Sequence, residues 1–405
     1  MRDEPGQVTE KPISQQQMKQ ANLSRLFSDL RSLGRLSRAE LAVRNQLSPT
    51  TVSHLIAELL ARQLVRETDK TANGFVGRNP ILLEINPAGG LLLVVEMHRN
   101  GFRLVDYDLA LNRLAAAFFE LTAFSPLADL VAERIDAFTA AHSILSAPLL
   151  GVVFAIPALI DQKDSRVIYS TVIQFDPADH FVQHLAQRLS VPVRLGNESA
   201  FWCYAESDQS GHADCVFIDV GEGIGCDMMI HGQLFQGANG LQGEIGHMTV
   251  DCRGPVCACH NRGCLELFAS LPALARRSAA KARTEPDSRL FRQSGQAEIS
   301  LADLVSAWTA GDDLAAALIE EEALYLAAGI NNVINLFDPA EVVLGGGIRA
   351  AGENFMALVN RCLNEIRQNR QATVRLSERD DNAMARGAAR WLLDDLVDRQ
   401  ALFHA

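Results

Sequence analysis

The chain has 405 residues, enough for two or three domains that each bury a core of their own. Hydrophobic residues make up 48% and charged residues 21%, and no window approaches the roughly 18 uninterrupted apolar residues of a membrane span. Residues 1–20 lack the apolar core of a secretion signal, so we expect a cytoplasmic protein with reduced thiols. A membrane-spanning protein and a disulfide-stapled module are thereby excluded.

The net charge of −12 is distributed unevenly along the chain. Residues 1–90 hold 12 Lys/Arg against 9 Asp/Glu, a balance of +3. Residues 91–405 hold 25 against 40, a balance of −15. Because nucleic acid is polyanionic, the N-terminal part is the place where it would bind.

Three helices are predicted at the start of the chain. An apolar period of 3.6 residues predicts the first over residues 18–33. Ser37, with Glu40 three residues on, has the capping-box pattern that begins a second helix, ending near Asn45. Ser48 and Pro49 suit the start of a third.

The third helix has the features of a recognition helix. A tight turn joins it to the second helix, and small polar side chains at the start of such a helix enter the major groove of DNA. Its candidate DNA contacts are Pro49, Thr50, Thr51, Ser53 and His54. A β-wing follows, with strands 64–67 and 81–85 and with Arg78 at its tip, where it would reach a phosphate or the minor groove. A small three-helix packing domain is the alternative.

The pattern from residue 87 onward is α/β. Predicted strands at 91–97, 102–109 and 114–121 precede a helix, a strand, a helix and a strand, at 126–145, 149–156, 177–190 and 193–195. Another helix begins at Glu198, and strands 215–220 and 225–231 with a short third strand open a second series. This duplication predicts two lobes around a cleft. We expect the domains to be 1–86, 87–203 completed by helix 382–405, and 204–381 with a loop at 247–266.

Cysteine and histidine cluster in that loop. Four of the eight cysteines fall between residues 252 and 264, in the spacing His247-x9-Cys257-x-Cys259-x4-Cys264. Such a cluster in a reduced compartment predicts a tetrahedral Zn²⁺ site with these four ligands. Cys252 and His260 are the alternative ligands. A closed four-ligand site favours a structural zinc over a catalytic one.

The chain from residue 91 to residue 405 resembles the ROK family of repressors and sugar kinases, and the N-terminal part resembles its repressor branch. The matching segments are 243–247, 257–266, 334–339, 342–347 and 386–389, with 77–80 in the wing. His260 departs from the family pattern, which usually has Gly there. The resemblance implies an N-terminal winged helix-turn-helix followed by an actin-like (RNase-H-like) two-lobe sugar-kinase fold.

The resemblance also implies which residues would contact a sugar: Asn197, Glu198, Glu244, His247 and Glu266. His247 would bind zinc with one ring nitrogen and face the sugar with the other. Alternatively, the last three are present for the zinc loop alone.

The parts that make the family's kinases active are altered in this chain. Residues 96–100 stand at the first phosphate loop without its glycine pair. Glu222 stands beside the second, where its carboxylate would repel a triphosphate. Glu198 replaces the catalytic Asp, and Ala158 replaces a Gly of the sugar loop.

We therefore expect a repressor of carbohydrate-related genes without enzymatic activity. It would bind a palindromic double-stranded DNA operator as a homodimer or a dimer of dimers. A sugar, a sugar phosphate or a transport-protein partner would control it. The alternative is an ATP-dependent sugar kinase with an N-terminal appendage.

Overall fold

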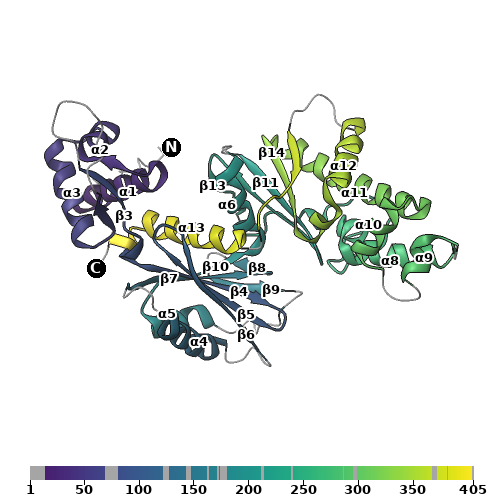
Figure 1. Ribbon diagram of the computed structural model, residues 1–405, viewed down its shortest axis with the longest axis horizontal. Helices are drawn as coiled ribbons and strands as arrows, with labels where there is room; N and C mark the ends of the chain where they lie inside the picture. The colour runs from purple at the N-terminus through teal and green to yellow at the C-terminus, as the bar shows by residue number, and fades with distance from the viewer. Residues whose placement is uncertain are drawn as a thin grey trace, which may run out of the picture.

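The computed structural model describes residues 14–68, 81–121, 127–142, 147–161, 164–170, 173, 180–210, 214–238, 240–285, 287–294, 299–366, 372–380 and 382–403. Figure 1 shows an elongated molecule with two sheets and their helices, and with a small helical unit at the end away from the second sheet. No helix among these residues is long and apolar enough to cross a membrane.

The N-terminal unit, residues 14–68 and 81–85, contains three helices and a three-stranded antiparallel sheet of order β1-β3-β2. Its elements are α1 (Gln15–Leu33), β1 (Leu36–Ser37), α2 (Arg38–Asn45), α3 (Pro49–Ala61), β2 (Val65–Glu67) and β3 (Leu82–Ile85). The Ser37–Glu40 capping box and the Ser48 N-cap are present as predicted. The short strand β1 was not predicted.

The first lobe, residues 91–210 as far as they are described, is built on a sheet of order β10-β7-β4-β5-β6. Its strands are β4 (Leu91–His98), β5 (Gly101–Asp108), β6 (Arg113–Glu120), β7 (Leu149–Ile156) and β10 (Val193–Asn197). Its helices are α4 (Leu127–His142), α5 (Phe181–Leu189) and α6 (Glu198–Ser210). Parts of two predicted helices, 143–145 and 177–179, lie outside the described residues.

The second lobe, residues 214–380 as far as they are described, repeats this topology with a sheet of order β13-β12-β11-β14-β15. Its strands are β11 (Cys215–Val220), β12 (Ile224–Ile230), β13 (Gln233–Leu234), β14 (Glu341–Gly345) and β15 (Thr373–Leu376). Its helices are α7 (Glu266–Ala269), α8 (Leu271–Ala282), α9 (Arg289–Ser294), α10 (Leu301–Thr309), α11 (Asp313–Phe337) and α12 (Gly352–Ile366). In both sheets the second strand is antiparallel to the first and the fourth is parallel to it, as a duplication predicts.

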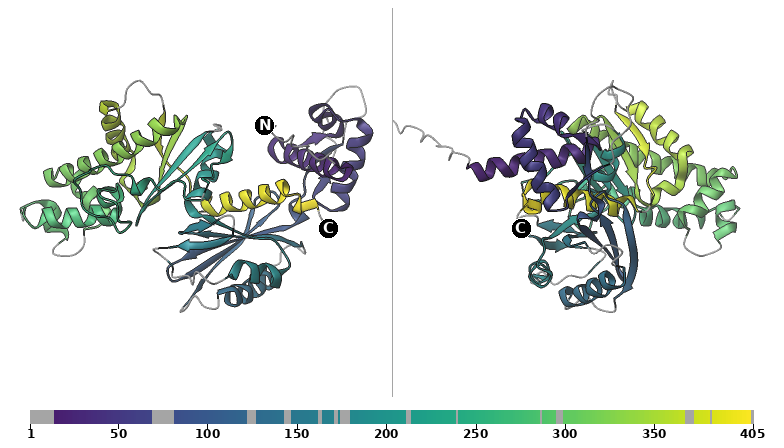
Figure 2. Two further views of the ribbon diagram at one scale, coloured as in Figure 1. Left: turned by 180° about the vertical axis from the view of Figure 1, so that it is seen from behind. Right: turned by 60° about the vertical axis from the view of Figure 1, so that its left-hand side comes forward.

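Helix α13 (Ala383–Asp398) connects the parts of the molecule. It packs on β4 and β7 of the first lobe and on α6, and its far end contacts α1 (Figure 1). Alternate residues of β4 point to opposite faces, so Leu92 and Val94 pack in one core with α13, while Leu93 and Val95 pack with α4 and α5. Figure 2 shows the N-terminal unit above this end of α13 from behind.

One hairpin was not predicted. β8 (Leu159–Asp161) and β9 (Arg166–Tyr169) pair antiparallel beside the first sheet. Each strand is too short to give a clear alternation of apolar and polar residues, which is the signal for a half-buried strand. The hairpin adjoins the end of β7, where the family's sugar loop was expected.

Candidate functional site

Helix α3 exposes the side chains that the sequence nominated for DNA. Pro49, Thr50, Ser53 and His54 are exposed, and Thr51 is half-buried. The other face of α3 is buried through Val52, Leu55, Ile56 and Leu59. The local structure follows from capping: Ser48 Oγ accepts the backbone N–H of Thr51 at 3.1 Å.

Some polar side chains on α3 make hydrogen bonds within the helix, and others do not. Ser53 Oγ donates to the carbonyl of Pro49 at 2.8 Å, and the hydroxyls of Thr51 and Ser48 lie 2.8 Å apart. Thr50 and His54 point outward from the same turn. Arg78, the predicted wing contact, lies outside the described residues. The strands on either side of it, β2 and β3, are paired antiparallel.

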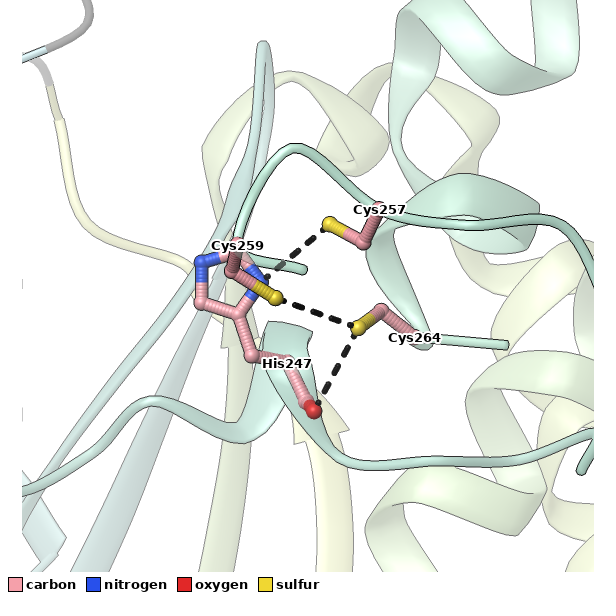
Figure 3. Close-up of side chains that lie close together, drawn as sticks. All are labelled: His247, Cys257, Cys259 and Cys264. Carbon is pink, nitrogen blue, oxygen red and sulfur yellow. Dashed lines mark hydrogen bonds between the residues drawn. The ribbon is translucent and has the colours of Figure 1, made fainter. Parts of the chain in front are cut away.

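The four predicted metal ligands converge in the loop that follows β13. One ligand atom from each of His247, Cys257, Cys259 and Cys264 lies within 4.8 Å of the others (Figure 3). Cys257 Sγ lies 3.8 Å from His247 Nδ1, and the sulfurs of Cys259 and Cys264 lie 3.6 Å apart. Sulfurs that share a tetrahedral zinc are separated by about 3.8 Å. The donor set and its spacing therefore fit a metal ion.

Neighbouring groups shape this cluster. Burial, and next the adjacent thiols, raise the pKa of Cys264 to about 12, whereas a backbone hydrogen bond at Asn261 lowers the pKa of Cys259. Asn261 Nδ2 also donates to the carbonyl of His247 at 2.9 Å. The alternative ligands, Cys252 and His260, are exposed and are not in the cluster.

The backbone explains the one departure from the family pattern. His260 has a φ of +68°, a left-handed conformation in which glycine is the least strained residue. A glycine is therefore expected at this position on physical grounds, and a histidine there has a modest conformational cost.

His247 lies between the cysteines of the cluster and the carboxylate of Glu244. Its Nδ1 faces the cysteines, and its Nε2 lies 3.7 Å from Glu244 Oε2. On the same side, Glu266 Oε2 accepts the backbone N–H of Ile224 at 3.0 Å. A Cβ atom on Gly223 would come within 2.7 Å of that carboxylate oxygen, so the glycine gives Glu266 room. The structure thus brings together Glu244, His247 and Glu266.

Asn197, at the end of β10, is hydrogen-bonded to two neighbouring segments. Its Nδ2 donates to the carbonyl of Ala158 at 2.8 Å, which fixes the loop after β7. Its Oδ1 accepts from the backbone N–H and the hydroxyl of Ser199, both at 3.0 Å. The Ser199 hydroxyl also lies 2.5 Å from Asp227 Oδ2. The Ser199 hydroxyl has only one proton to donate. It can donate to Asn197 while accepting from Asp227 only when Asp227 is protonated.

Burial raises the pKa values of three carboxyl groups near these residues, to different extents. Burial, and next the charges of Asp219 and Glu96, raise the pKa of Glu198 to about 8. Burial also raises the pKa of Asp219 to about 6. For Asp227 the value is about 7, where burial outweighs the hydrogen bonds from Ser199 and Gln242. At neutral pH the side chain of Glu198 is therefore mostly protonated, so it cannot act as a general base.

At the position of the first phosphate loop the chain makes a tight turn. The chain between β4 and β5 is a two-residue turn, Arg99-Asn100. Beside it, Glu96 is buried and accepts from Arg103 Nη1 at 3.1 Å, although burial still raises its pKa. In the second lobe Gly346 has a φ of +77°, and a Cβ on it would come within 2.2 Å of Asp219 Oδ1. Packing against Asp219 therefore accounts for glycine at position 346 without any need for a bound nucleotide.

The sequence analysis did not nominate Glu96, Ser199, Asp219 or Asp227. A signal existed for the two aspartates, because each stands inside an otherwise apolar strand, in CVFIDV and IGCDMMI. A buried carboxylate in such a strand lowers the stability of the fold unless it is paired, so its presence indicates a partner or a functional role. Glu96 and Ser199 have no comparable local signal, because their partners come from other elements.

The fold and these sites define a two-lobe protein of actin-like architecture, with a helix-turn-helix at one end. A family model described as "ROK family" matches residues 120–395. This is more than half of the chain, and the chain belongs to the ROK family.

Relatives and solved structures agree with this assignment. The chain is 26% identical over 336 residues to the xylose repressor of Bacillus subtilis, covering 82% of this chain and 83% of that protein. It is 27% identical over 361 residues to the transcriptional dual regulator NagC of Escherichia coli, covering 86% and 85%.

Among solved structures, a ROK family transcriptional regulator, a homologue of the Escherichia coli MLC protein, matches with a TM-score of 0.84 at 24% identity. That match covers 96% of this chain and 100% of the other. A Streptomyces griseus glucokinase with glucose and AMPPNP matches with a TM-score of 0.61 at 24% identity, covering 75% of this chain and 99% of that enzyme. The predicted fold class is confirmed.

Proposed function

We propose that this protein is a DNA-binding repressor of carbohydrate-related genes. The observation that supports this most directly is α3, which exposes Pro49, Thr50, Ser53 and His54 on one face while its other face is buried. Such a helix can lie in the major groove and present its first turns to base edges. A homodimer or a dimer of dimers would place two such helices on a palindromic operator, with Arg78 reaching the neighbouring minor groove.

The acidic cleft is the proposed effector site. In this proposal Glu244, His247 and Glu266 would line one side of a cleft between the lobes, and Asn197 with Glu198 would line the other; the first three lie close together. Carboxyl, imidazole and amide groups bind sugar hydroxyls through hydrogen bonds. Two relatives bear the names xylose repressor and N-acetylglucosamine repressor. These names support a sugar, a sugar derivative or a sugar-transport protein as the effector.

We propose that the Cys/His cluster holds a structural Zn²⁺. Three cysteines and one histidine are a typical structural donor set. With His247 Nδ1 on the metal, Nε2 would carry the proton and could donate to Glu244 or to a ligand. The zinc loop and the cleft would then be coupled through one side chain.

An enzymatic role as a sugar kinase has less support. The short turn after β4 offers no glycine pair for phosphate, and Glu198 is mostly protonated at neutral pH. Purified protein with ATP, Mg²⁺ and a panel of sugars should form no sugar phosphate. A turnover near 1 s⁻¹, ordinary for a working enzyme, would favour the kinase.

We propose three domains with separate roles. Residues 1–86 would read DNA, and residues 87–203 with 382–405 and residues 204–381 would form the two lobes around the cleft. A repressor works where its operator is, so the proposed location is the cytoplasm.

Operator binding tests the proposed function. Selection from random duplexes with full-length protein should yield a palindromic site, and fluorescence anisotropy then gives its affinity. His54→Ala should weaken operator binding by about tenfold, because one good base contact is worth about 1–3 kcal/mol. The matched control is His231→Ala, a 90% exposed histidine in the turn after β12. Equal effects of both substitutions would refute α3 as the recognition helix.

A further inference from the structure

A pocket of about 600 Å³ lies where the N-terminal unit meets the first lobe and α13. Its size is within the range of pockets that bind small molecules, roughly 300–1,000 Å³. Walls come from the end of α1, from the β2–β3 sheet, from the turn between β5 and β6, and from α13. The residues proposed for the sugar do not line it.

The lining of this joint pocket is strongly cationic. Its charged residues are Arg31, Arg35, Arg66, Glu84, Arg386 and Arg390. Five guanidinium groups thus face one carboxylate, in a chain whose net charge is −12. Such a local excess of positive charge attracts anions over several ångströms.

The single carboxylate is already shared. Glu84 accepts from Arg35 Nε at 2.7 Å and from Arg66 Nε at 2.8 Å. Burial opposes ionisation of Glu84, but hydrogen bonds from Arg35 and Arg66 lower its pKa below the ordinary value. It therefore remains an anion that neutralises at most one of the two arginines.

The cations on α13 face the same space. Arg390 Nη1 donates to the carbonyl of Tyr204 at 3.3 Å, and its guanidinium lies over the Tyr204 ring, 4.7 Å from the centroid. Arg31 is paired with Asp394. The exposed guanidinium of Arg386 makes no hydrogen bond or ion pair within the part of the chain that the structure describes. Arg386 is therefore available to a ligand.

We propose that this pocket binds a small phosphorylated metabolite. Planar guanidinium groups bind phosphate through paired N–H donors, which is why arginine clusters recognise phosphate. Arg35 and Arg66 belong to the N-terminal unit and Arg386 belongs to α13, so one bound dianion would bridge the two. Its binding would fix the angle at which α3 is held.

The bridge has a consequence for DNA binding, and this part rests on the proposed function. α1 is joined to the far end of α13 by Ser24 Oγ, which donates to the carbonyl of Val397 at 3.1 Å, and its Phe27 ring contacts Phe403 in the turn after α13. The pocket lies on the other side of that joint, at the end of α1. An anion that binds one orientation of the unit more tightly shifts operator affinity by the same factor.

Calorimetric titration of the full-length protein with inorganic pyrophosphate tests the site without DNA. We expect saturable binding to the wild type, weakened about tenfold or more by Arg386→Gln and by Arg35→Gln, because each removes a charge-assisted contact. The matched control is Arg361→Gln on α12, where a 60% exposed arginine pairs with Glu320. Absence of binding, or equal affinity in all three variants, would overturn the proposal.

A second measurement separates this site from a DNA contact. Pyrophosphate should change operator affinity in the wild type beyond the effect of sodium chloride at equal ionic strength, and it should have no such effect in Arg386→Gln. If Arg386→Gln instead weakens operator binding and lowers its salt dependence without pyrophosphate, Arg386 contacts DNA phosphate and the proposal is overturned. If no operator is found, the titration alone still decides the pocket.

Discussion

The Cys/His cluster and the acidic cleft share His247, but they hold their ionisable groups in opposite ways. In the cluster, four donor atoms converge within 4.8 Å of one another. Two carboxyl groups assigned to the cleft have separate partners: Glu266 accepts from the backbone of Ile224, and Asp227 lies beside the hydroxyl of Ser199. Convergence of this kind suits one cation at the centre, whereas burial raises the pKa of Glu198 and of Asp227 and so favours their protonated forms.

The difference shows how neighbouring sites can have separate tasks. A converged donor set gains its stability from the ion and fixes the loop around it. A dispersed set of partly protonated carboxyls keeps hydrogen-bonding groups available around an open space. Removing the ion, the protons or the shared contact should therefore have three different effects.

Loss of the metal should have the largest effect. The wild-type protein should hold about one zinc per chain by elemental analysis, and Cys264→Ala should hold none and lose more than about 5 °C in Tm. The reason is that three remaining donors cannot close a tetrahedral site. Cys252→Ala, an exposed cysteine outside the cluster, should keep both zinc and Tm. Wild-type protein that is free of zinc when purified without chelator would contradict the site.

Replacement of the buried carboxyl group of Glu198 should have an intermediate effect on stability that depends on pH. The pKa of Glu198 is about 8 in the folded state against an ordinary 4.5. Between these values the folded state keeps a proton that the unfolded state has lost, so stability falls as pH rises. Glu198→Gln removes this loss, and its Tm advantage over the wild type should grow by about 3 °C from pH 5 to pH 8.

The matched control for this titration is Glu222→Gln, which removes an exposed carboxylate of the glycine turn. Asp227 is present in all three proteins, so its own titration cancels in the comparison. A Tm difference between Glu198→Gln and wild type that stays constant with pH would show that Glu198 is not held protonated.

Local signals in the sequence were sufficient for most of the fold and for the metal ligands. The Ser37–Glu40 capping box, the Ser48 N-cap and the cysteine spacing act within a few residues, and the structure contains each of them. The order of strands was predictable because a duplicated pattern implies a duplicated sheet.

Features that depend on distant pairing were not predictable. Glu96 meets Arg103 across a strand pair, and Ser199 meets Asp227 from another lobe. The arginines of the joint pocket come from positions as far apart as Arg31 and Arg390. No spacing rule relates such residues, because their proximity arises from how whole elements pack. The contacts proposed for Arg78 remain a prediction.

The contact between His247 and Glu244 should give the smallest effect and the sharpest distinction between the two regions. Glu244→Gln removes one carboxylate that lies 3.7 Å from His247 Nε2 and leaves all four metal donors in place. We expect zinc content and basal Tm to stay unchanged. In a thermal-shift screen with glucose, xylose, N-acetylglucosamine and their phosphates, any Tm gain seen with wild type should fall by roughly half. His247→Ala should instead lose zinc and the ligand response together. Loss of zinc in Glu244→Gln would mean that the carboxylate supports the metal loop and that cluster and cleft are a single site.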